Sequence, residues 1–189
     1  MLKKLLTIVG VALIGLVAFI ATRPPTYHVE RTTTIKAPPE AVYAVISDLH
    51  RFGEWSPWDR RDPAMKKTFS GPANGVGASY AWEGNKDVGA GKMTITEAKP
   101  PSYVRIRLEF LQPFASVAEV GLDVVPAGTG EVKTTWSMDG HNNFVSKAFS
   151  LVMNMDKMIG KDFDDGLASL KHVAEAAPAA PAPTAEAKP

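Results

Sequence analysis

Between residues 65 and 138, one segment after another alternates apolar and polar side chains with a period of two. The clearest segment is 103–111, whose apolar side chains are Val104, Ile106, Leu108 and Phe110. Successive side chains of a β-strand point to opposite faces, so each segment is expected to have one apolar and one polar face. Glycine- and proline-rich turns separate the segments. The pattern therefore predicts an antiparallel sheet with one face covered by protein and the other in water.

The C-terminal region can supply the cover. Large apolar residues recur at spacings of three and four between residues 144 and 174, which is typical of an amphipathic helix that Asn142 or Asn143 can cap. A strand is expected at 27–36, a helix at 38–48, and a second short helix or turn at 49–63. This order predicts an α+β fold in which a curved antiparallel sheet of about seven strands wraps one long C-terminal helix.

The N-terminus forms a separate segment. Residues 5–21 contain no charge, Lys3 and Lys4 precede them, and Arg23 follows. As a helix this run covers roughly 26 Å, which is close to the ~30 Å apolar core of a bilayer. A cleaved signal peptide is the alternative, but cleavage after Ala21 would place Phe19 where a small residue is required. We interpret the run as a single transmembrane helix.

The lysines before this helix predict its orientation, with the N-terminus inside a bacterial-type cytoplasmic membrane. The chain then divides into an N-terminal transmembrane anchor at 1–25, one domain at 26–174 and a tail at 175–189. The domain is expected on the outer side, in the periplasm or outside the cell. The tail is mostly alanine and proline and has no large apolar side chain, so we expect it to be disordered.

Composition excludes several classes of site. The chain has no cysteine, which rules out disulfides, thiolate nucleophiles and cysteine-ligated metals. Its formal net charge of +1 is not the strongly basic balance of a nucleic-acid-binding domain. The histidines are scattered, and Asp162, Asp164 and Asp165 are expected on a solvated helix face rather than around a metal. No metal, cofactor or nucleic-acid partner is predicted.

Three stretches of the domain carry a family resemblance. They are residues 55–100, which begin WSPWDRRDP, residues 135–144, TWSMDGHNNF, and residues 154–171, NMDKMIGKDFDDGLASLK. Together with the order of elements, they resemble the polyketide cyclase/dehydrase branch of the START-like (SRPBCC) superfamily over about residues 27–174. The resemblance implies the helix-grip fold, with an apolar cavity between the sheet and the long helix. It also implies binding of hydrophobic small molecules, and it brings no universal catalytic residues.

The residues alone leave two interpretations of the aromatic and methionine-rich composition, a packed core and a ligand cavity. The resemblance favours the cavity. The residues to which it assigns ligand binding are Trp55, Trp58, Tyr80, Trp82, Phe110, Trp136, Met138, Met155 and Ile159. No catalytic residue and no metal ligand are assigned.

Three functions follow from these observations. The first is a membrane-anchored binding protein for a lipid-like or polycyclic molecule, attached to the membrane through residues 5–21. The second is a cyclase or dehydratase, which would need an acid or base at the cavity. The candidates for that role are Glu83, Asp87, Asp139 and His141. The third is an envelope interaction module without a ligand, which a completely filled cavity would favour.

Overall fold

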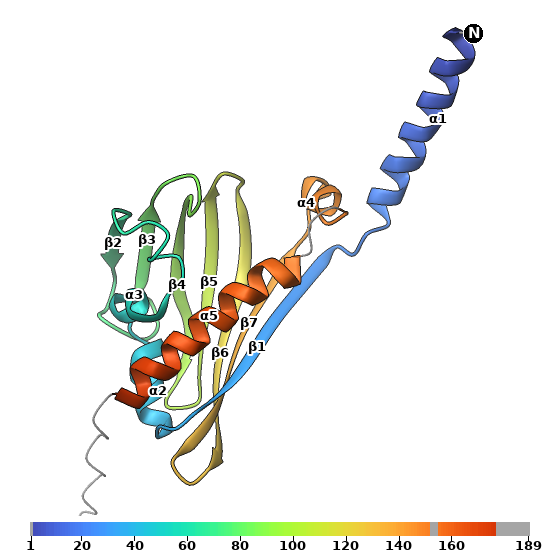
Figure 1. Ribbon diagram of the computed structural model, residues 1–189. Coiled ribbons are helices and arrows are strands. Elements are labelled where there is room, and N and C mark those ends of the chain that lie inside the picture. The colour runs from blue at the N-terminus through green and yellow to red at the C-terminus, as the bar shows by residue number, and fades with distance from the viewer. Residues whose placement is uncertain (1, 152–154, 177–189) are drawn as a thin grey trace, which may run out of the picture.

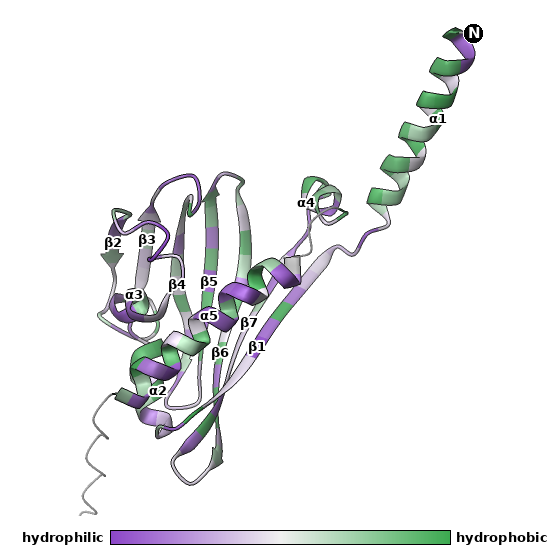
Figure 2. Ribbon diagram, viewed as in Figure 1, coloured by the Kyte–Doolittle hydropathy of each residue, from purple (hydrophilic) through white to green (hydrophobic). Residues whose placement is uncertain are grey.

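The structure, a computed structural model, describes residues 2–151 and 155–176, apart from the side chain of Met155. Helix α1 (Leu2–Ala21) projects away from the sheet, and residues 22–25 connect it to the first strand (Figure 1). Beyond Lys3 and Lys4 the helix is mostly apolar (Figure 2), and Ile20 is its one buried residue. By length and composition α1 could cross a membrane, although a signal sequence would meet the same criteria.

Seven strands form one antiparallel sheet, as the alternating segments predict. They are β1 (Thr26–Ile35), β2 (Lys66–Ser70), β3 (Ser79–Glu83), β4 (Ala90–Lys99), β5 (Tyr103–Gln112), β6 (Ser116–Gly128) and β7 (Glu131–His141). The order across the sheet is β1-β7-β6-β5-β4-β3-β2. Strands β2 to β7 are therefore consecutive hairpins, and the first strand completes the sheet by pairing with the last.

Short helices and one long helix complete the domain. They are α2 (Pro39–Ile46), a 3₁₀ turn η1 (Leu49–Arg51), α3 (Phe52–Trp55), α4 (Phe144–Phe149) and α5 (Met155–Ala176). Helix α5 runs across one face of the sheet (Figure 1), and its buried residues include Phe163, Leu167 and Leu170. The predicted curved sheet on a C-terminal helix is confirmed.

The predicted start of the long helix at residue 144 was wrong. Asn143 does cap a helix, since its side chain accepts a hydrogen bond from the backbone N–H of Ser146 (2.8 Å). That helix is the short α4, which ends at Phe149, where the Ser150 hydroxyl donates to the Lys147 carbonyl (2.7 Å). The apolar residues of α4 fit the same spacing of three and four as those of α5. The spacing therefore did not reveal that Phe144 and Phe149 are exposed on a separate short helix instead of packed under the sheet.

At its other end, α5 runs two residues beyond the predicted domain end at Ala174. Glu175 is tied to the domain, since its Oε1 accepts a hydrogen bond from the backbone N–H of Lys36 (2.7 Å) and lies 3.4 Å from Lys171 Nζ. The remainder of the predicted tail, 177–189, lies outside the described residues.

Two glycines let α5 approach the sheet. A methyl group added at Gly166 would lie 2.5 Å from Cζ3 of Trp136 on β7, whose ring stacks on Phe163 with the ring centres 4.1 Å apart. A methyl group added at Gly160 would meet the guanidinium of Arg31 on β1. Arg31 Nη1 lies 2.9 Å from Asp156 Oδ1, at the start of α5. Small residues at these positions thus set the spacing between helix and sheet.

We predict that Gly166→Ala lowers the free energy of unfolding by up to about 2 kcal/mol. The gain in helix propensity is about 1 kcal/mol, but the packed Trp136 ring cannot move aside and overpacking costs about 1–3 kcal/mol. Urea unfolding of the detergent-solubilised protein, followed by tryptophan fluorescence, measures this change. All four tryptophans lie in the domain, so the signal reports its unfolding.

Gly160→Ala is the matched control. Its new methyl group displaces a flexible arginine whose ion pair with an exposed carboxylate is worth about 0–1 kcal/mol, and the helix-propensity gain offsets that loss. We expect a change within about 0.5 kcal/mol. Equal losses in the two variants would show that Trp136 does not limit the approach of the helix.

Candidate functional site

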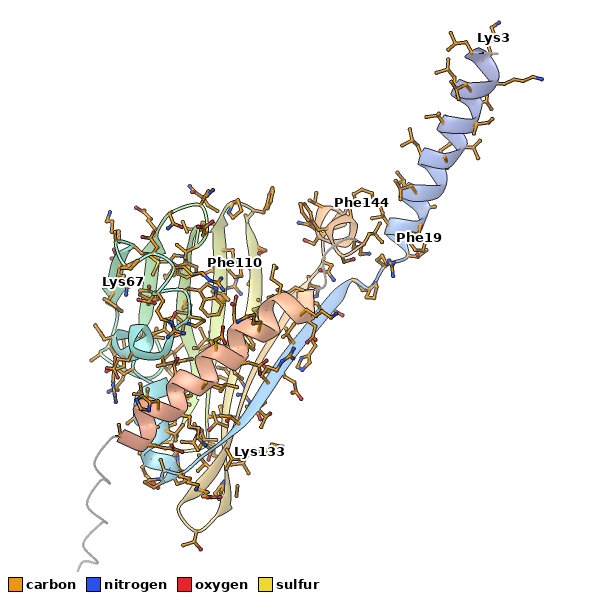
Figure 3. The ribbon with its side chains drawn as sticks, in the orientation of Figure 1. Lys3, Phe19, Lys67, Phe110, Lys133 and Phe144 are labelled. Carbon is orange, nitrogen blue, oxygen red and sulfur yellow. The ribbon has the colours of Figure 1, made fainter. Side chains whose placement is uncertain are left out.

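A cavity of about 450 Å³ lies between the sheet and α5. Side chains from β1 and from β3 to β7 form one wall, and α3 with the loop after it and α5 form the opposite wall. Phe110 of β5, which lines the cavity, is labelled in Figure 3, where α5 crosses in front of the sheet. Most of the wall is apolar, and it contains aromatic rings and methionines. The space is large enough for a small organic molecule.

Eight of the nine residues assigned from the sequence line this cavity: Trp55, Trp58, Tyr80, Trp82, Phe110, Trp136, Met138 and Ile159. Period-two alternation explains the strand residues, since Tyr80 and Trp82 share a face of β3, and Trp136 and Met138 share a face of β7. Met155 begins α5, and its side chain lies outside the described part of the structure.

The aromatic rings contact one another and form a continuous wall. Trp55 meets Trp136 edge to face with the ring centres 5.0 Å apart, and Trp136 stacks on Phe163. On the other side, the ring centre of Trp82 lies 6.0 Å from that of Tyr80 and 6.3 Å from that of Phe110. Such pairs add about 0.5–1.5 kcal/mol each beyond their buried area. The cavity is therefore bounded by mutually supporting rings.

The polar atoms of three of these rings are covered by protein. Trp55 Nε1, Trp136 Nε1 and the Tyr80 hydroxyl are buried and have no hydrogen-bond partner among the described residues. Trp82 differs, because its Nε1 donates to the Val88 carbonyl (3.1 Å). Burial raises the pKa of Tyr80 to about 12. The rings thus present mainly their apolar surfaces to the cavity.

Two carboxylates that were not predicted as site residues also line the cavity. Asp162 is only 7% exposed and pairs with Arg61, while Asp59 pairs with Lys67. The expectation that Asp162 belongs to a solvated helix face was therefore wrong. A signal for its burial was present, since Asp162 lies three residues after Ile159 and four before Gly166, on the apolar stripe of α5.

The other two aspartates of that group do face outward. Asp164 lies 3.4 Å from Arg31 and Asp165 lies 2.7 Å from Lys161, and both carboxylates are largely exposed. Within residues 2–151 and 155–176, no group of three or more histidines and carboxylates is arranged to hold a metal ion.

The four candidates for an acid or base do not all lie at the cavity. Asp87 and His141 line the cavity, whereas Glu83 and Asp139 do not. Asp139 Oδ1 instead lies 2.7 Å from Nδ1 of His28, and this hydrogen bond raises the pKa of the histidine. Glu83 is exposed near Lys66 on the neighbouring strand. Two of the four can therefore reach a molecule in the cavity.

The cavity opens at one end of the sheet. The strand register aligns Glu83 with Ala90, Ala90 with Gln112, and Phe110 with Ser116, so the β3–β4 and β5–β6 loops lie at one end. The exposed lining residues of this end are Lys86, Asp87, Gln112, Pro113, Ser116, His141 and Met158. Arg61, also exposed, borders the same loops, since its carbonyl accepts a hydrogen bond from Asn85 (3.4 Å). We call this opening the mouth.

Comparison with known proteins agrees with this architecture. Residues 26–175 match a family model described as "Polyketide cyclase / dehydrase and lipid transport". A search of curated proteins gave no match. Many solved structures share the fold.

Among them, protein CV1439 from Chromobacterium violaceum is 15% identical with a TM-score of 0.56, over 81% of this chain and 99% of its own. Truncated norcoclaurine synthase from Thalictrum flavum is 13% identical with a TM-score of 0.58, over 81% and 96% of the two chains. The di-domain ARO/CYC protein BexL, from the BE-7585A biosynthetic pathway, is 13% identical with a TM-score of 0.57, over 86% of this chain and 54% of its own. At these identities the likeness establishes the fold.

We predict that Tyr80→Phe raises the free energy of unfolding by about 1 kcal/mol, because it removes a buried hydroxyl that has no partner among the described residues. The phenol favours its protonated form in the folded protein. Wild-type stability should therefore fall as the pH rises from about 10 to about 12, and the part of this fall due to Tyr80 should be absent from the variant. Urea unfolding at pH 7 and above pH 10 measures both effects.

Tyr103→Phe removes the same atom at a partly exposed position, where the hydroxyl is 3.5 Å from Glu97 Oε2. We expect a change within about 0.5 kcal/mol at pH 7. A loss of more than about 1 kcal/mol in Tyr80→Phe would contradict the assignment, because it would show that the hydroxyl makes a stabilising bond.

Proposed function

The chain belongs to the polyketide cyclase/dehydrase and lipid transport family, and from this premise we propose that it binds a hydrophobic small molecule in the cavity between the sheet and α5. The observation that carries the proposal is the 450 Å³ apolar cavity, open at one end and walled by aromatic rings. Its volume lies within the range of small-molecule sites. The ligand class is lipid-like or polycyclic, because the rings present mainly apolar surface.

The size of the cavity sets the scale of affinity. Burying about 300 Å² of apolar ligand surface at about 25 cal/mol per Å² gives roughly 7 kcal/mol before the costs of association. Those costs are several kcal/mol, so micromolar or weaker binding is expected without strong polar contacts. Binding of this strength suits a protein that both takes up and releases its ligand.

We propose that α1 anchors the domain in a membrane as a single transmembrane helix. All but one of its described residues are at least partly exposed, and residues 2–21 are long and apolar enough to span a bilayer. Lys3 and Lys4 favour an N-terminus inside a bacterial-type cytoplasmic membrane, with residues 26–174 outside it. In this scheme residues 1–25 are the anchor and the Ala/Pro-rich C-terminus is a tail.

Acid–base catalysis of a cyclisation or dehydration is the second candidate function. It is favoured by Asp87 and His141, which line the mouth and are both exposed. The buried carboxylates are less suitable as acids or bases, because Asp59 and Asp162 are each paired with a cation. If catalysis takes place, the Asp87→Asn/His141→Gln variant should retain a molecule that differs in mass from the one that the wild-type protein retains. A dehydratase would give a difference of one water.

An envelope interaction module without a ligand is the third function considered. A cavity filled completely by its own side chains would favour it, and the open volume of about 450 Å³ does not.

A substitution that reduces the volume of the cavity tests ligand binding. Val120 lines the cavity on β6 and is 6% exposed. We expect Val120→Trp to reduce the hydrophobic ligand recovered by solvent extraction and mass spectrometry of the purified full-length protein, and to weaken dye binding at least tenfold, because the indole occupies ligand volume. Tenfold corresponds to about 1.4 kcal/mol.

Val125→Trp is the control, since Val125 lies on the same strand but is 55% exposed and does not line the cavity. This variant should bind like the wild type. If neither the wild type nor Val125→Trp carries any extractable molecule or binds any member of a hydrophobic dye panel, the binding function is wrong.

A further inference from the structure

Large apolar side chains are exposed around the mouth. Of the described residues outside α1, those at this end with a large exposed apolar side chain are Leu111, Phe114, Val117, Phe144, Val145, Phe149 and Met158. We call this set the apolar rim. Phe114 is 64% exposed, and Phe144 and Phe149 are about half exposed. Exposed apolar residues gathered at one site indicate a contact surface. The corresponding residues elsewhere are Phe69, Val76 and Val125, and they are separate from the rim.

The topology places the rim at the end of the domain from which α1 departs. Thr26, the first residue of β1, pairs with His141, and Ala118 pairs with Gly140, so the start of β1 lies beside the β5–β6 loop and the end of β7. The linker of residues 22–25 allows at most roughly 18 Å between α1 and β1. Any bilayer that holds α1 is therefore held close to the rim.

Helix α4 joins the rim to α1. The two helices are in contact, and Lys147 Nζ of α4 donates to the Ala21 carbonyl (3.3 Å) at the end of α1. Figure 3 shows Phe144 of α4 beside the end of α1 where Phe19 lies. The apolar side chains of α4 thus continue from the apolar surface of α1. A short helix with exposed phenylalanines beside a lysine has the character of an interfacial segment.

The rim and the mouth are built from the same segments. Pro113 and Ser116, on either side of Phe114, line the cavity, and so does Ser146 of α4. Met158 belongs to both sets. A surface covering the rim would therefore also cover the opening through which a ligand enters.

We propose that the apolar rim rests on the bilayer that holds α1, so that the mouth faces the membrane and the ligand passes between cavity and leaflet without crossing bulk water. This inference rests on the proposed anchoring and ligand binding. The partner of the apolar rim is a lipid surface. The short linker holds the bilayer close to the rim, and the apolar surface of α4 is continuous with that of the spanning helix.

A fluorophore attached at one position at a time tests the contact between the apolar rim and the bilayer. The chain has no cysteine, so Phe114→Cys, Phe149→Cys and the control Val125→Cys can each carry one NBD fluorophore on the full-length protein in phosphatidylcholine/phosphatidylglycerol vesicles. Val125 is exposed and lies toward the opposite end of β6 from the rim. Labels at 114 and 149 should be quenched by doxyl-labelled lipid and protected from aqueous iodide, and the label at 125 should behave in the opposite way. Equal iodide quenching at all three positions would overturn the proposal.

A transfer experiment tests the route. The probe is a pyrene-labelled fatty acid, detected by energy transfer from the cavity tryptophans. With the full chain held in amphipol, Phe114→Asp/Phe149→Asp should bind the probe as the wild type does. With the chain in vesicles, loading from the bilayer should slow at least tenfold in this variant and stay unchanged in Val125→Asp. Unchanged loading in the double variant would overturn the route.

Failure of the proposed function gives a different result. If the wild-type protein binds no probe in amphipol, the binding function fails for this ligand class. The quenching experiment still decides whether the rim meets the membrane, because it does not require a ligand.

Discussion

The packing of α5 on the apolar face of the sheet is the interaction on which the domain depends. Trp136 stacks on Phe163 and meets Trp55 edge to face, and Gly166 provides the space for its ring. A sheet with one apolar face cannot remain in water uncovered, so the helix that covers it determines the fold. The distance between the two layers also sets the volume left between them. The same contact thus stabilises the domain and forms the inner wall of the cavity.

The position of the cavity mouth follows from the order of the strands. Consecutive hairpins bring the β3–β4 and β5–β6 loops to one end, and pairing of β1 with β7 brings the chain from α1 to that same end. The opposite end carries the β2–β3 and β6–β7 turns and no connection to α1 (Figure 1). An antiparallel sheet closed by its first strand therefore makes the mouth and the apolar helix neighbours, which is the geometric basis for the proposed exchange with a bilayer.

Sequence patterns determined the secondary structure and the layers. Period-two alternation identified the strands because one face of the sheet is buried, and spacings of three and four identified α5 for the same reason. Seven of the eight predicted residues that line the cavity, Trp82 and Ile159 among them, lie on strands or helices, and an element that buries one face has little freedom in which side chains it buries. The uncharged run at the N-terminus is likewise a local property that the sequence shows directly.

Tertiary structure decided what depends on contacts between distant segments. The spacing pattern runs through the end of α4, and only the fold shows that Phe144 and Phe149 are exposed beside α1 instead of buried under the sheet. Asp162 is buried because Arg61, distant in the chain, pairs with it. Periodicity describes one segment at a time, whereas ion pairs, the 450 Å³ cavity and the end at which it opens depend on how segments meet in space.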